Sequence, residues 1–110
     1  MSATIDISNP TPGSTVGRSF TSFGSSSYDP SAPSNTTIVV SLKDSSGNLI
    51  SVTTGSNPVV INVTTGQTMW PWSAPFAVGA DYSDCRVVAE VRFDGTLEAS
   101  DAVEDIDITQ

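Results

Sequence analysis

Residues that could carry out hydrolytic chemistry are sparse in this chain. Its 110 residues include no histidine, and a serine or cysteine nucleophile usually needs such a base held beside it. Two carboxylate pairs, Asp81 with Asp84 and Glu104 with Asp105, have the atoms for acid and base roles. A chain this short cannot build both a folded core and a substrate cleft around them. We therefore expect that the protein is not an enzyme.

Metal and cofactor chemistry finds equally little support. Asp81, Asp84 and Asp101 offer the oxygen ligands that calcium prefers, but no loop shows an ordered run of ligands at calcium-binding spacing. We interpret them as solvated carboxylates. Cys85 is the only cysteine, which excludes an internal disulfide and a cysteine-based metal cluster and is typical of a small buried hydrophobic residue. The sequence predicts no metal and no cofactor.

The most unusual tripeptide is Trp70-Pro71-Trp72. Two large rings on alternate positions of a proline-stiffened strand can form a flat platform for sugar stacking or for a protein contact. We expect one ring in the core and the other partly exposed; the alternative is that both are buried, as tryptophans often are between two sheets. Phe23 and Tyr28 are further candidates for an apolar patch. The predicted binding residues are therefore Trp70, Trp72, Phe23 and Tyr28.

The charge of the chain argues against two classes of partner, nucleic acids and membranes. Twelve acidic residues face only four basic ones, which gives a net charge of −8, and nine of the acids lie between Asp81 and Asp107. Such a charge repels phosphate backbones and anionic lipid headgroups, and no apolar run approaches membrane-spanning length. We expect neither nucleic-acid binding nor membrane insertion.

The elements that would position these residues are strands. Apolar residues alternate with period two between turn-forming residues, and no segment shows helical spacing. The clearest strand runs from Cys85 to Phe93, with Cys85, Val87, Ala89, Val91 and Phe93 on one side, and we expect it near the centre of its sheet. The segment 70–78 contains two prolines, which predicts an edge strand or a bulged one, and not a central strand.

The same alternation also predicts a hairpin, an irregularity in the last strand and the number of sheets. Ile38, Val40 and Leu42 share one face of a strand, and the turn at 44–48 is expected to connect it as a hairpin to Leu49, Ile50 and Val52. Val103 is out of step with Ile106, which predicts either a bulge or a late start of the last strand. About seven short strands with turns at this spacing imply two packed antiparallel sheets in one domain, residues 1–110.

Several stretches together resemble bacterial and phage immunoglobulin-like domains of the fibronectin type III kind. They are Ile5–Val16 for the first strand and loop, Ser19–Gly24 for the second strand, and Tyr82, Val87–Val91 and Val103–Ile108 for the later ones. The resemblance implies an immunoglobulin-like sandwich that acts in adhesion or scaffolding, in surface proteins, beside enzymes or on phage particles. It also implies weak binding to host surfaces or glycans and no shared active site.

The expected function is that of a non-catalytic structural or adhesive module. The start of the chain lacks the basic and apolar regions of a secretory signal, so we expect a virion-surface protein, such as a phage capsid decoration or tail protein, with a capsid or tail protein as its partner. The alternative is a carbohydrate-binding or spacer module of a larger secreted bacterial surface protein. The expected location is the virion surface or the extracellular space.

Overall fold

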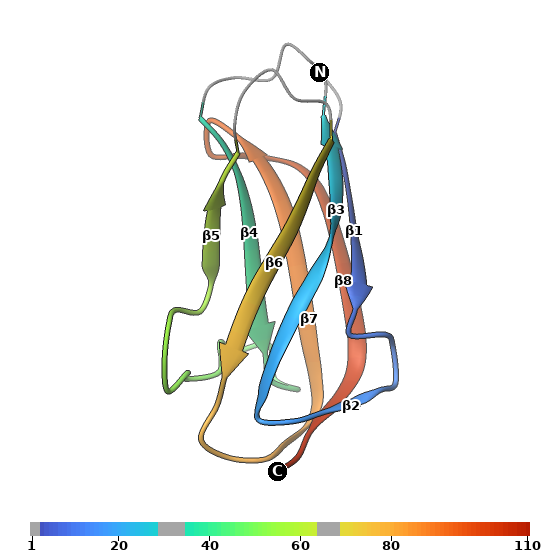
Figure 1. Ribbon diagram of the computed structural model, residues 1–110, viewed down its shortest axis with the longest axis vertical. Helices are drawn as coiled ribbons and strands as arrows, with labels where there is room; N and C mark the ends of the chain where they lie inside the picture. Colours follow the sequence, from blue (N-terminus) through green and yellow to red (C-terminus); the bar gives the residue numbers. More distant parts are fainter. Residues whose placement is uncertain (1–2, 29–34, 64–68) are drawn as a thin grey trace.

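The computed structural model describes residues 3–28, 35–63 and 69–110, with the backbone alone described for Met69 and Trp70. Within these ranges the chain forms eight strands and no helix (Figure 1). A helix with the length and apolarity needed to span a membrane is accordingly absent from these ranges. The strands are β1 (Ala3–Asn9), β2 (Thr15–Val16), β3 (Ser19–Tyr28), β4 (Thr36–Lys43), β5 (Val59–Asn62), β6 (Met69–Ala77), β7 (Tyr82–Phe93) and β8 (Thr96–Ile108).

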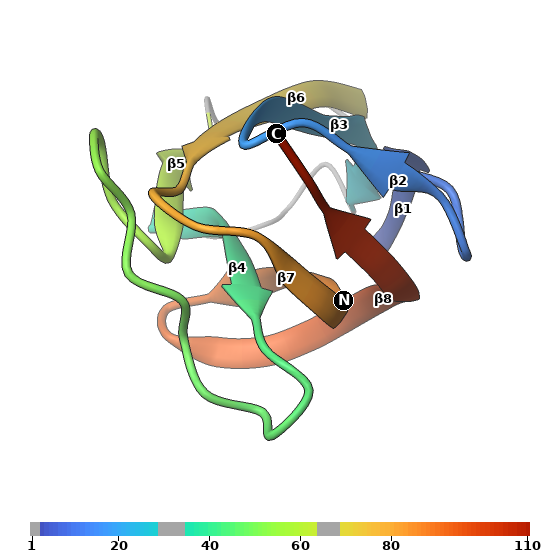
Figure 2. The same cartoon turned by 90° about the horizontal axis from the view of Figure 1, so that it is seen from below.

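The strands form the two sheets of a β-sandwich, which confirms the predicted fold class. One sheet has the order β1-β3-β6 and the other the order β2-β8-β7-β4-β5, and the two face each other across the core (Figure 2). All pairs are antiparallel except β2 with β8, which is parallel. This pair departs from the expected purely antiparallel sheets: Val16 belongs to a short separate strand that joins the opposite sheet from β3.

The core lies where the sequence alternation places it. On β7, Cys85, Val87, Ala89, Val91 and Phe93 are all buried, and β7 is the middle strand of its sheet. The prediction of a central, half-buried strand is confirmed. The adjoining β4 buries Ile38, Val40 and Leu42 in the same way. Strand β6 is an edge strand, as its prolines indicated.

The predicted irregularity in the last strand is a bulge in β8. Cys85 pairs with Ile106 while Val87 pairs with Val103, so β8 has one residue more than β7 over this stretch. Asp105 lies in the bulge with a φ of 60°. The extra residue returns both Val103 and Ile106 to the buried side of the strand, and both are buried.

The connection after β4 differs from the predicted hairpin. The turn at 44–48 forms, and Ile50 N donates to Leu42 O at 3.1 Å, but residues 50–52 form no strand and β4 instead pairs with β5. The amide of Asn57 explains the difference. Its Oδ1 accepts from Leu42 N, and its Nδ2 donates to Leu42 O and Ile50 O. One side chain thus satisfies backbone groups that a continuing strand would have paired.

A close approach between strands fixes one glycine. Gly24 on β3 lies against β1 and beneath the Trp72 ring: a Cβ atom there would stand 1.9 Å from Asp6 O and 2.9 Å from Trp72 Cζ2. Strand β1 pairs with β3 in an unbroken register from Ala3 to Ile7, which lies opposite Gly24, and the register shifts directly afterwards, between Ile7 and Asn9. Only glycine fits here.

We predict that Gly24→Ala lowers the free energy of unfolding by at least about 2 kcal/mol, because the added methyl group overpacks a backbone contact. Urea unfolding followed by tryptophan fluorescence measures the change. Gly17→Ala is the matched control, since a Cβ atom at Gly17 meets only Ser19 O at an ordinary 3.8 Å. Equal stability of the two variants would contradict the packing described here.

Candidate functional site

Charge is distributed unequally between the two sheets. Strands β1, β3 and β6 together carry a single charged residue, Asp6. The five-stranded sheet carries Lys43, Asp84, Arg86, Glu90, Arg92, Glu98, Asp101, Glu104, Asp105 and Asp107. The outer face of the three-stranded sheet is therefore almost neutral in a strongly acidic protein.

An exposed aromatic residue lies on this neutral face. Phe23, on the middle strand β3, is 47% exposed. It stands directly opposite Ser73 on β6, and the exposed Pro71 and Pro75 are the diagonal neighbours on either side. Diagonal neighbours lie within reach of an aromatic ring. Phe23, Pro71 and Pro75, which we call the Phe23 patch, form a small apolar area in the middle of the face.

Hydroxyl groups surround the Phe23 patch. Thr21 and Ser25 flank Phe23 along β3, and Ser73 lies across from it. Further along the face, Thr4 on β1 is paired with Ser27 on β3, and their side-chain hydroxyls share a hydrogen bond. The face thus combines a flat apolar centre with neutral hydrogen-bonding groups, a composition suited to contact with another surface.

The other predicted binding residues lie elsewhere. Trp72 is 4% exposed and Tyr28 is 5% exposed, so both rings belong to the core and neither contributes to a surface patch. Ser26 Oγ donates to Tyr28 Oη at 3.1 Å. The backbone of Trp70 pairs with Ser26, but its side chain lies outside the described part of the structure, and so does the prediction of a partly exposed second indole.

The indole of Trp72 is buried without a hydrogen bond. Its Nε1 is the one buried side-chain polar atom, among those described, that has no partner. An unsatisfied buried donor costs about 1–3 kcal/mol, which the fold offsets by the apolar area that the ring covers between the sheets. Trp72 therefore serves packing rather than recognition.

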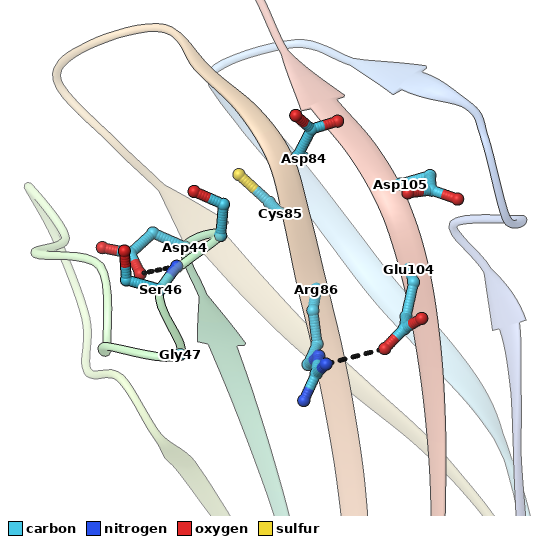
Figure 3. A pocket seen from close by; sticks show the side chains of 9 residues that line it. Asp44, Ser46, Gly47, Asp84, Cys85, Arg86, Glu104 and Asp105 are labelled. Carbon is cyan, nitrogen blue, oxygen red and sulfur yellow. Dashed lines mark hydrogen bonds and ion pairs between the residues drawn. The ribbon is translucent and has the colours of Figure 1, made fainter.

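A hollow of about 380 Å³ lies at the opposite, acidic sheet (Figure 3). It is formed by the turn at 44–48, the start of β7 and the bulge of β8, and it is lined by Asp44, Ser45, Ser46, Gly47, Asp84, Cys85, Arg86, Glu104 and Asp105. Asp84, Cys85, Glu104 and Asp105 are candidates in the sequence, but no pattern there groups them with the turn. The offset between Val103 and Ile106 located the bulge, but nothing in the sequence placed the turn opposite it.

The polar groups of the hollow are largely engaged with one another. Asp44 Oδ1 accepts from the backbone of Ser46 and of Asn48, which holds the turn. Arg86 Nη2 lies 2.7 Å from Glu104 Oε1. Both of these side chains are exposed, so the ion pair contributes little to stability. Arg86 is the one basic residue among those that line the hollow, and its charge is already paired.

The thiol of Cys85 at this site is a poor nucleophile. Burial raises its pKa, and the negative charges of Asp107, Asp44 and Asp84 raise the pKa further. The thiolate is the reactive form of cysteine, and this environment disfavours it. The Cys85 thiol is therefore not an activated nucleophile.

The carboxylates considered as metal ligands are not brought together. Asp81 forms an ion pair with Arg18 at 2.8 Å, whereas Asp101 Oδ2 accepts from Ile7 N at 2.9 Å, between the two sheets. In the ranges given above, no three histidine, cysteine, aspartate or glutamate side chains are grouped so that they could hold a metal ion.

Comparison with protein-family models and with curated protein sequences finds no match for this chain.

We predict that Cys85 lowers the stability of the protein at alkaline pH. The thiol of the unfolded chain ionises near pH 8.5, while the folded state holds its proton to higher pH. The unfolded state is therefore favoured increasingly as the pH rises above that value. Urea unfolding between about pH 7.5 and about pH 9.5 should show a steeper loss of stability for the native protein than for Cys85→Ala; parallel curves would refute the assignment.

Proposed function

We propose that the protein is a non-catalytic structural or adhesive module of the immunoglobulin-like class, and that it docks on a partner protein through the outer face of its three-stranded sheet. The surface of a virus particle is the setting that we propose, with a capsid or tail protein as the partner. The resemblance of the sequence to domains found on phage particles supports this setting.

The strand order supports the immunoglobulin-like class. In that fold the first, second and fifth strands share one sheet, while the third, sixth and seventh share the other. The order β1-β3-β6 and the run β8-β7-β4 agree with this arrangement when β2 is taken as a continuation of the first strand and β5 as the fourth strand, which here pairs with β4 in the larger sheet.

The unequal distribution of charge is the observation that carries the docking proposal. A partner that met the five-stranded sheet would have to neutralise or desolvate many carboxylates, which is costly. The three-stranded sheet presents a single carboxylate, that of Asp6, and offers Phe23 as an exposed aromatic side chain of the kind that dominates protein contacts. The partner surface that fits this face is uncharged and flat, with apolar side chains at its centre.

The acidic hollow gives a further reason to propose a non-catalytic role. Catalytic sites hold a nucleophile, a base and an orienting group within reach of one another. The hollow instead holds a thiol with a raised pKa and an arginine paired with a glutamate.

The positions of the chain ends favour a second candidate, a spacer within a longer surface protein. Strand β1 begins at one end of the long axis and β8 finishes at the other (Figure 1), and this axis measures 43 Å against 24 and 22 Å for the other two. Domains joined at such ends would follow one another in line. Under this reading the Phe23 patch and its hydroxyls would meet a neutral glycan.

The sedimentation behaviour of the native protein tests the proposal. We predict that the chain co-sediments with a large particle at a fixed ratio to a shell or tail protein, and that Phe23→Ala lowers its affinity for that particle at least tenfold, as loss of a central aromatic contact does. Leu97→Ala is the matched control, because Leu97 is equally exposed, at 48%, but lies on the other sheet.

The opposite results separate the two candidates. If the chain occurs only as part of a longer secreted polypeptide, the virion proposal fails and the spacer remains. If Phe23→Ala and Leu97→Ala bind the particle alike, docking through the three-stranded sheet is refuted.

A further inference from the structure

The two sheets of the sandwich meet along two seams, where an edge strand of one sheet faces an edge strand of the other. One seam lies between β1 and β8, and the other between β6 and β5. They differ in how the backbone groups of their edge strands are satisfied. Unpaired edge groups are a template for the addition of another strand, so this difference bears on self-association.

The seam between β1 and β8 is closed along the last part of β8. The segment that contains β2 lies along β8 and exchanges backbone hydrogen bonds with it: Gly13 N donates to Glu104 O, Asp107 N to Ser14 O, and Thr109 N to Val16 O. Further along, the Asp101 carboxylate accepts from Ile7 N of β1 and links the two strands. An added strand would therefore meet an edge that is already occupied over this part of β8.

The seam between β5 and β6 is joined at one end, where Thr53 N donates to Ala77 O at 2.8 Å. Along the rest, no residue in the described ranges pairs with the outer edge of β5. Val63 N donates to Thr36 O, and backbone groups in an antiparallel pair alternate in direction. Val59 and Ile61 therefore point their backbone groups at β4, whereas Val60 and Asn62 point theirs outward. Apart from β4, no described residue forms a backbone hydrogen bond with Val60 or Asn62.

The facing edge of β6 is protected. Val78 N donates to Arg18 O, so the same alternation turns Pro71, Ser73 and Pro75 toward the seam. Proline has no N–H to donate, and it is a usual means of blocking an edge strand. A strand that enters this seam can pair with β5 but not continuously with β6.

We propose that β5 is a self-association edge, at which β5 of a second copy of this chain pairs antiparallel to it about a two-fold axis at Ile61. In this register Val60 of each copy faces Asn62 of the other. Each outward N–H and C=O of the two edges then meets a partner, and the two five-stranded sheets become continuous. The edge is thus complementary to itself, as a two-fold interface requires.

The charge distribution favours a second copy as the occupant. Two chains of net charge −8 repel each other, yet β5 carries no charged residue and β4 carries only Lys43. The carboxylates of this sheet lie on β7 and β8, beyond β4 from the proposed contact. Joining the copies at β5 keeps these carboxylates far apart. Val60, 58% exposed, supplies an apolar contact across the edge.

The proposal is independent of docking through the three-stranded sheet. It uses the edge of the five-stranded sheet, and Phe23 takes no part in it. The contact involves few residues, so we expect a weak dimer that forms as the protein concentration rises.

Sedimentation equilibrium over about a hundredfold range of concentration, up to about 1 mM, measures the dissociation constant. We expect a monomer–dimer equilibrium in the native protein and a dissociation constant at least about tenfold higher for Val60→Glu, because the two introduced glutamates would be diagonal neighbours across the strand pair, within reach of each other, and would repel. Leu97→Glu is the matched control. It makes the same change of net charge at a side chain that is also exposed, at 48%, but lies on β8, away from the β5 edge.

A second variant, Val60→Pro, tests the backbone pairing of the two edges without changing the net charge. Val60→Pro removes the outward N–H, which β4 does not use, and should weaken the dimer while the cooperative unfolding of the monomer persists. In the native protein, the amide protons of Val60 and Asn62 should exchange more slowly with solvent as the concentration rises. Unchanged exchange, a monomer at every concentration, or equal dimerisation of Val60→Glu and Leu97→Glu would each overturn the proposal. So would protection of these amides only on addition of a strand from another protein.

Discussion

The packing of two apolar inner faces against each other is the constraint on which the rest of this structure depends. The alternation along β7 and β4 gives the five-stranded sheet a continuous apolar side, which includes Val87, Val91, Ile38 and Leu42. That side must be covered. The sheet β1-β3-β6 covers it, with Phe76 and Trp72 buried at the contact. The bulge in β8 and the glycine at position 24 are local adjustments that allow this packing.

Because the core uses only one side of each strand, the outer sides are free to differ. The five-stranded sheet carries the carboxylates, and both of its arginines are paired: Arg86 with Glu104 and Arg92 with Glu90. Such exposed pairs contribute little to stability, but together with the unpaired carboxylates they keep this face hydrated. The three-stranded sheet uses hydroxyls and prolines in place of charge. Two surfaces of different chemistry thus result from one core.

The ends and edges of the sheets are finished by individual side chains. The Asn57 amide satisfies backbone groups where β4 loses its strand partner, Asp44 holds the following turn through Oδ1, and Asp101 links β8 to β1. Each is a short polar side chain that substitutes for a backbone partner. At β5, no such side chain from the part of the chain that the structure describes reaches the outer edge.

The sequence by itself determined the fold class, the central position of β7, the exclusion of β6 from the centre of a sheet and an irregularity near Val103, because each depends on period-two alternation or on proline, which act locally. It also identified Phe23 as a candidate surface residue. Only the tertiary structure decided that Trp72 and Tyr28 are buried, that Val16 belongs to a separate strand and that Asn57 replaces a strand partner. It also decided that the turn at Asp44 faces the β8 bulge. These features depend on which distant strands lie side by side, and the alternation of a strand is the same whichever neighbour it has.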